Sequence, residues 1–173
     1  GEEGVAFGGT GSCHVRWRPL PEGSSAPLYR LCLVERSYFP CDDLAEHKTG
    51  SYLRAVRVRM KANARGFEDG IRVSPDGFVS ETSTANLFLV RGRDLVWTPA
   101  VEGLLPGVTR AALVERLKRR GVRVEERRVR VEDVSSDETR EVWVTSSGVG
   151  VRRVDMVEQR IYREDGWREL RAA

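Results

Sequence analysis

The sequence predicts a mixed α/β fold of the α+β class, in which helices and β-hairpins alternate along one domain. The chain has 173 residues, of which 40% are hydrophobic, and this is enough for one domain with its own core. Two segments carry apolar residues at helical spacing and end at a glycine, whereas several short apolar runs are separated by turn sequences. Because helical and hairpin patterns alternate, a mixed domain is expected, and no internal repeat is present.

The first half of the chain predicts a connection, a strand and a helix. Residues 1–27 are rich in Gly, Ser and Pro and are predicted to be a loop or connection. The dense apolar run at 28–35 predicts a buried strand. A helix is predicted over 50–65, and Gly66 is placed to end it. The apolar positions that predict this helix are Leu53, Val56, Met60 and Ala64.

Two hairpins follow. Residues 71–74 and 78–81 flank Pro75-Asp76-Gly77, a turn sequence whose glycine accepts a positive φ. Residues 86–90 and 95–98 flank a second turn around Gly92.

The remaining elements are a helix and three short strands. Leu113 and Leu117 lie on one face of a helix predicted over 108–120, and Gly121 closes it. Further strands are predicted at 122–124, 142–145 and 149–154.

The overall charge excludes few functions and indicates none. There are 29 basic and 26 acidic residues, a net charge of +3 that is spread along the chain. The most basic stretch, 116–130, contains Glu125 and Glu126 and no aromatic residue, so a solvated face explains it better than nucleic-acid binding. We therefore expect no nucleic-acid partner.

The cysteines and the hydropathy pattern indicate a cytoplasmic protein. Three cysteines without a Cys-x-x-Cys pair suit reduced thiols, and the spacing of Cys13, His14, Cys41 and His47 matches no usual zinc pattern, so no metal site is predicted. No apolar run is long enough to span a bilayer, and no leader sequence opens the chain. We expect no membrane association.

Three segments carry groups that suit one cofactor. Lys48 lies just before the first predicted helix, where a loop can present its amine for imine formation. Glu81 ends a hairpin strand and offers a carboxylate to a cationic ring nitrogen. The stretch 103–110 leads glycines into a helix, whose first N–H groups and dipole favour a phosphate. These are the needs of pyridoxal phosphate.

Each segment has a simpler explanation when it is taken alone. A lysine such as Lys48 is most often a solvated surface residue, and Glu81 is equally explained as a strand-end glutamate in water. Thr109 is either a phosphate ligand or a plain helix N-cap. The order of the three segments is what favours the cofactor.

That order resembles the class IV (fold type IV) pyridoxal-phosphate enzymes, which include branched-chain aminotransferases, D-amino acid aminotransferases and aminodeoxychorismate lyases. His-Lys-Thr at 47–49 is similar to the Schiff-base lysine segment, which makes Lys48 the catalytic lysine. The segment 80–88, Ser-Glu-Thr-Ser-Thr-Ala-Asn-Leu-Phe, is similar to the one whose glutamate meets the pyridine nitrogen, here Glu81. Tyr52 falls near a tyrosine that binds the ring oxygen, although helix packing explains it equally well.

The resemblance also implies a phosphate site. Gly107 opens the phosphate-cup sequence, in which Val108 and Thr109 would donate to the phosphate. Ser146 and Ser147 resemble the later hydroxyl-rich turn, with Ser147 as a phosphate ligand.

The resemblance implies the D-amino acid aminotransferase-like fold for only part of the chain. Residues 28–173 are expected to form the pyridoxal-phosphate-binding domain, and 1–27 a loop or remnant of an N-terminal small domain that is largely missing. That domain supplies a basic phosphate ligand and many substrate contacts in the family. Arg153 stands where the family has a proline.

Three functions follow from the resemblance. The first is transamination of a small amino acid by a homodimer, and the second is the lyase reaction that releases pyruvate from aminodeoxychorismate to give 4-aminobenzoate. The interval of four residues between Lys48 and Tyr52 is nearer to the D-amino acid and lyase branch. The third is a truncated homologue without catalytic activity, which serves as a binding or structural module.

Overall fold

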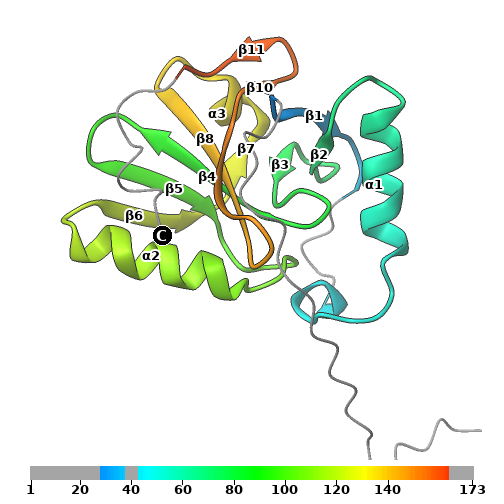
Figure 1. The fold of residues 1–173 in the computed structure, drawn as a ribbon, viewed down its shortest axis with the longest axis horizontal. Coiled ribbons are helices and arrows are strands. Elements are labelled where there is room, and N and C mark those ends of the chain that lie inside the picture. Colours follow the sequence, from blue (N-terminus) through cyan, green and yellow to red (C-terminus); the bar gives the residue numbers. More distant parts are fainter. Residues whose placement is uncertain (1–27, 38–42, 164–173) are drawn as a thin grey trace, which may run out of the picture.

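The computed structural model describes residues 28–37 and 43–163, and the predicted loop at 1–27 lies outside them (Figure 1). The helices are the 3-10 helix η1 (Asp43–Glu46), α1 (Leu53–Asn63), α2 (Val108–Arg119) and α3 (Val131–Ser135). The strands are β1 (Arg30–Val34), β2 (Asp69–Arg72), β3 (Phe78–Val79), β4 (Asn86–Arg91), β5 (Leu95–Pro99), β6 (Arg123–Arg127), β7 (Val129–Arg130), β8 (Thr139–Ser146), β9 (Gly150–Val154), β10 (Met156–Val157) and β11 (Arg160–Ile161).

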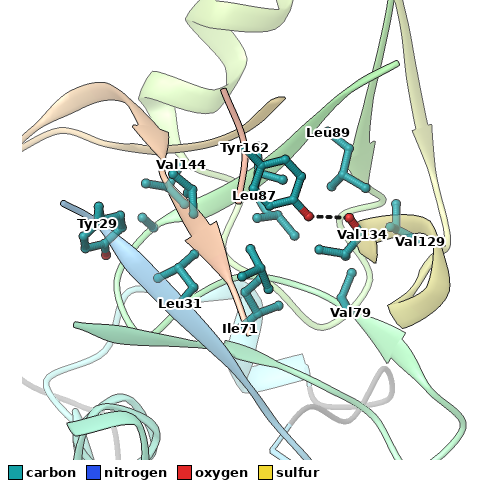
Figure 2. Close-up of a cluster of buried hydrophobic side chains, with 14 of the residues drawn as sticks. Tyr29, Leu31, Ile71, Val79, Leu87, Leu89, Val129, Val134, Val144 and Tyr162 are labelled. Atoms are coloured by element: carbon teal, nitrogen blue, oxygen red, sulfur yellow. Dashed lines mark hydrogen bonds between the residues drawn. The ribbon is translucent and has the colours of Figure 1, made fainter. Parts of the chain in front are cut away.

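Two larger sheets and two long helices form four layers, and β3 and β7 pair as a separate two-stranded sheet. One sheet has the order β11-β10-β1-β2 and is covered by α1, and the other has the order β6-β5-β4-β8-β9 and is covered by α2 (Figure 1). The main core lies between the sheets, where Leu31 and Ile71 of the first sheet pack with Leu87 and Val144 of the second (Figure 2). In the same view the Tyr162 hydroxyl donates a hydrogen bond to the carbonyl of Val134.

The alternation of side chains along each strand explains the layers. In β4, Leu87 and Leu89 face the main core, whereas Phe88 and Val90 pack against α2. In β1, Leu31 faces the main core, whereas Cys32 and Val34 pack under α1. Both strands are therefore buried on both faces, which explains why their sequences read as continuous apolar runs.

Each long helix connects two parallel strands. β1 and β2 are parallel and joined through α1, and β5 and β6 are parallel and joined through α2. The loop that enters each helix therefore follows the carboxyl end of a parallel strand. Loops at such ends commonly form binding sites in α/β folds.

Most of the predicted elements are present. Gly66 and Gly121 close the two predicted helices with φ of 80° and 77°, and Gly77 has φ of 79° in the predicted turn. The hairpin through Gly77 forms, with Val73 opposite Val79, although β2 also pairs in parallel with β1. The elements α3, β7, β10 and β11 and the 3-10 helix η1 were not predicted, because pieces of two to five residues show no periodicity.

The first helix is present, but its predicted apolar face does not face the core. Val58 and Ala62 are the buried residues of α1. Leu53, Val56 and Met60 are 67%, 47% and 65% exposed. The face of α1 that packs on the sheet is therefore a narrow stripe of small and β-branched side chains. Gly70 of β2 allows the helix to approach the sheet closely, because a Cβ at Gly70 would come within 2.5 Å of Val34 and 3.1 Å of Val58.

Candidate functional site

A cavity of about 310 Å³ lies between the loop that enters α1 and the turn that precedes β4. Its wall includes Lys48, Tyr52, Arg54, Arg72, Glu81 and Asn86. The fold thus brings the predicted lysine and the predicted carboxylate to one cavity. The loop after β1 contributes Lys48 to the wall, and the loop after β5 contributes Leu105.

Lys48 is an exposed residue in a compact loop. The Thr49 N–H donates to the His47 carbonyl at 3.0 Å, and the His47 N–H donates to the Leu44 carbonyl at 3.2 Å. The Lys48 Nζ lies 5.9 Å from the centre of the Tyr52 ring, at the outer limit of a cation–π contact. Tyr52 is itself half exposed and precedes α1 as its N-cap residue, without a side-chain capping bond. The amine is therefore reachable from the cavity.

Glu81 is held by three donors. Its Oε1 accepts a hydrogen bond from the Arg72 guanidinium at 2.9 Å, and its Oε2 accepts from the Asn86 amide and the Leu105 N–H, both at 3.3 Å. Burial of the carboxylate raises the pKa of Glu81 to about 7, even though Arg72 and the Leu105 N–H oppose this shift. Glu81 is therefore a largely buried acid whose pKa lies well above its ordinary value.

The turn after Glu81 is shaped by its own hydroxyl groups. The Thr82 N–H donates to the Ala85 carbonyl at 2.8 Å, and the Thr82 Oγ1 accepts from the Thr84 and Ala85 N–H groups. The Ser83 hydroxyl donates to the buried carboxylate of Asp69 at 2.8 Å. These bonds fix the backbone of the turn that follows Glu81.

Asn86 connects the Glu81 carboxylate to the entrance of α2. Its amide donates to Glu81 and, at 2.8 Å, to the Leu105 carbonyl. Its Oδ1 would lie 2.2 Å from a Cβ built on Gly107, a separation that no side chain tolerates. A side chain at 107 therefore requires Asn86 to move.

The entrance of α2 exposes its first N–H groups. Gly107 is the N-cap residue, with an extended backbone and no side-chain cap, so the alternative of Thr109 as the N-cap is wrong. Val108 is 79% exposed and Thr109 is half-buried. The first N–H groups of a helix have no acceptor within it, and they carry the positive end of its dipole. This terminus suits an anion.

The predicted hydroxyl-rich turn lies at the same end of the sheet. Thr145 of β8 pairs with Asn86 of β4, and Ser146 and Ser147 follow it into the turn toward β9. Ser146 is half-buried and Ser147 is exposed. The Thr145 Oγ1 is buried and has no hydrogen-bond partner among the described residues, which marks a polar group that a ligand would satisfy.

The predicted site residues thus fall into two neighbouring groups. Lys48, Tyr52 and Glu81 line the cavity. The second group does not line it and is connected to it through Asn86: Gly107, Val108, Thr109, Ser146 and Ser147.

Two residues that contact Glu81 were missed by the sequence analysis. Arg72 stands between Ile71 and Val73, which are both fully buried, and a buried arginine needs a partner. The hairpin turn at 75–77 already predicts that it lies opposite the strand that ends at Glu81. Asn86 belongs to the predicted segment, yet its two contacts depend on the tertiary position of Leu105.

Comparison with known proteins identifies the family. The sequence model of amino-transferase class IV matches residues 8–157, which is most of the chain. This chain belongs to the class IV aminotransferase family. The family has a mixed α/β fold of type IV and implies pyridoxal phosphate as its cofactor.

Relatives of this class IV chain with known sequences are distant and longer. It is 27% identical over 150 residues to branched-chain-amino-acid aminotransferase-like protein 2 of Arabidopsis thaliana, which covers 87% of this chain and 26% of the relative. It is 37% identical over 110 residues to the mitochondrial branched-chain-amino-acid aminotransferase 1 of the same plant, which covers 62% and 28%. The chain therefore spans about a quarter of the length of each of these relatives.

Solved structures support the fold over most of this chain. The T.th. branched-chain amino acid aminotransferase, complexed with N-(5'-phosphopyridoxyl)-L-glutamate, has a TM-score of 0.75 at 25% identity and covers 83% of this chain and 49% of that enzyme. A putative 4-amino-4-deoxychorismate lyase from Legionella pneumophila has a TM-score of 0.74 at 27% identity, with coverage of 82% and 52%. This chain spans about half of each.

The residues present fit the implied cofactor on three observations. A buried carboxylate faces an open cavity, a glycine keeps the helix entrance free of a Cβ, and a buried hydroxyl at the end of β8 lacks a partner among the described residues. Across the described ranges, helices are too short or too polar to cross a membrane.

Proposed function

We propose that this chain forms the pyridoxal-phosphate-binding part of an aminotransferase that acts on a small amino acid. One observation carries the proposal: Lys48 and Glu81 line one cavity, and Asn86 connects that cavity to the exposed helix entrance at Gly107. Binding of pyridoxal phosphate needs an amine for the covalent bond, a partner for the ring nitrogen and an anion site for the phosphate, in this arrangement. Residues 28–173 are the corresponding domain.

Each group has a defined task in this proposal. Bound pyridoxal phosphate supplies an aldehyde carbon and a ring that delocalises the electron pair released at the substrate α-carbon. The Lys48 amine would hold the cofactor, and as a free amine it would move the α-proton of the substrate. The Glu81 carboxylate accepts a hydrogen bond from the protonated ring nitrogen. Tyr52, half exposed beside Lys48, offers its hydroxyl to the ring oxygen.

The second group of residues would bind the phosphate. The N–H groups of Val108 and Thr109 point out of the first turn of α2, where the helix dipole favours an anion. The Ser146 and Ser147 hydroxyls close the site from the end of β8. Hydroxyl and N–H donors of this kind bind phosphate without a buried counter-charge.

Reductive trapping tests the proposal. The protein is incubated with pyridoxal phosphate, reduced with borohydride and digested, and the modified peptide is mapped by mass spectrometry. We expect one phosphopyridoxyl group on Lys48 and none in Lys48→Ala. Lys118→Ala is the matched control, because Lys118 is an equally exposed lysine on α2, outside the cavity.

Failure of this test has a defined meaning. A folded protein without an adduct at Lys48 contradicts the enzyme proposal and favours a non-catalytic homologue that serves as a binding or structural module. An adduct spread over several lysines contradicts the assignment of Lys48.

A lyase that releases pyruvate from aminodeoxychorismate is the second candidate. The likeness to the Legionella protein, at a TM-score of 0.74, supports the lyase reaction. The likeness to the T.th. branched-chain enzyme, at a TM-score of 0.75, supports transamination to the same extent. Activity assays distinguish the two reactions. An aminotransferase forms a 2-oxo acid from an amino acid when an acceptor 2-oxo acid is present, whereas the lyase releases pyruvate and 4-aminobenzoate.

We further propose a homodimer, which light scattering at several protein concentrations would detect.

A further inference from the structure

The arginine beside Glu81 is a feature of this chain that the proposed function leaves unexplained. Arg72 lies in β2, whose four residues are all buried, and its side chain is 9% exposed. Its Nε donates to the Ser37 carbonyl at 2.8 Å, and its guanidinium pairs with the Glu81 Oε1 at 2.9 Å. The arginine therefore reaches from the end of β1 to the wall of the cavity.

Stability alone is a poor reason for this arginine. A buried ion pair loses most of its Coulombic gain to the desolvation of both charges, and well-packed apolar residues in its place are often as stable. Backbone bonds already join the two segments, because the Arg72 N–H donates to the Glu81 carbonyl at 2.9 Å and the Ser80 N–H donates to the Arg72 carbonyl at 3.1 Å.

We propose that Arg72 is a positioning residue of the cofactor site, which acts through Glu81 by holding its carboxylate in the direction and charge state that accept a hydrogen bond from the ring nitrogen. This inference rests on the proposed function. The guanidinium fixes Oε1, while Asn86 and the Leu105 N–H reach only Oε2 at the longer distance of 3.3 Å. The carboxylate thus has one firm anchor.

The charges around the cavity identify Arg72 as the group that acts on Glu81. Arg54, Lys48 and His47 also line the wall, from α1 and the loop before it. Arg72 favours ionised Glu81 most, through its charge and its hydrogen bond, and the Leu105 N–H is the other group that does so. Burial raises the pKa of Glu81 and Arg72 lowers it, so removal of Arg72 raises the pKa of this carboxyl further.

The test follows the carboxyl group of Glu81 by ¹³C NMR in the protein without cofactor, with Glu81→Gln to assign its signal. In Arg72→Met we expect the titration midpoint of Glu81 to rise by about one pH unit or more. Arg72→Lys keeps the charge and should restore most of the shift. Arg91→Met is the control, because Arg91 is a buried arginine at the other end of β4, where it pairs with Glu138.

The outcomes separate this inference from the proposed function. A Glu81 midpoint that is unchanged in Arg72→Met, or that moves equally in Arg91→Met, overturns the role of Arg72 whether or not the protein binds pyridoxal phosphate. A shifted midpoint that Arg72→Lys reverses supports it. Absence of the Lys48 adduct in the unaltered protein overturns the proposed cofactor function, and is read independently of the titration.

Discussion

Gly107→Ala tests the connection between the two halves of the site. The new methyl group would lie 2.2 Å from the Asn86 Oδ1, so the asparagine must leave its place. It then loses its bonds to the Leu105 carbonyl at 2.8 Å and to Glu81 at 3.3 Å. The perturbation therefore reaches the carboxylate through one side chain.

The size of the effect follows from these contacts. Two hydrogen bonds contribute roughly 1 kcal/mol each, and a methyl forced into a packed region costs about 1–3 kcal/mol. The φ of Gly107 is −66°, which alanine accepts, so lower chain entropy in the unfolded state offsets roughly 0.4–1 kcal/mol. We expect the free energy of unfolding to fall by about 2–5 kcal/mol, and pyridoxal phosphate to bind more weakly.

Equilibrium unfolding in urea gives the change, and a double-mutant cycle assigns its cause. In the background of Asn86→Ala the new methyl has space, so Gly107→Ala should then cost less than about 0.5 kcal/mol. Gly148→Ala, where a Cβ meets no atom within 4 Å, controls for the glycine-to-alanine change itself. Equal effects of Gly107→Ala in both backgrounds would refute the reasoning.

Three further predictions concern charge, catalysis and the core. Folding raises the pKa of Glu81 from 4.5 to about 7, so its contribution to stability is full below pH ~4.5 and is lost as the pH rises through about 7. Unfolding in urea at several pH values should show a loss of up to about 3 kcal/mol that Glu81→Gln removes, and a pH-independent difference would contradict it. Lys48→Ala should abolish the absorbance band of bound cofactor and leave the free energy of unfolding within about 0.5 kcal/mol, since Lys48 is exposed; a retained band contradicts its role. Leu117→Ala, at a fully buried position under the five-stranded sheet, should cost about 2–5 kcal/mol in urea unfolding, whereas Lys118→Ala next to it should cost less than about 0.5 kcal/mol; equal losses would place Leu117 outside the core.

Local signals predicted most of the fold. The two long helices, the turn at Gly77 and the hairpin around Gly92 depend on residues close in sequence, and glycines with positive φ mark their ends. The face of α1 was not predictable in this way. Leu53 and Met60 have helical spacing, but the close approach to Gly70 favours the smaller Val58 and Ala62.

The site was predictable as a set of segments and not as a geometry. Lys48 and Glu81 were identified from sequence order, and the structure places both on one cavity wall, although their chemical roles stay predictions. The contacts that give Glu81 its properties come from Arg72 and from the Leu105 backbone. Leu105 reaches the carboxylate only after β4 and β5 have paired, and no local pattern encodes that distance.

The central claim is that Lys48, Glu81 and the entrance of α2 form one cofactor site. A crystal structure of the protein grown with pyridoxal phosphate tests it most directly. We predict a covalent bond to the Lys48 Nζ, the ring nitrogen within hydrogen-bonding distance of the Glu81 carboxylate, and the phosphate on the N–H groups of Val108 and Thr109. A cofactor bound elsewhere, or bound with its phosphate away from α2, would contradict the claim.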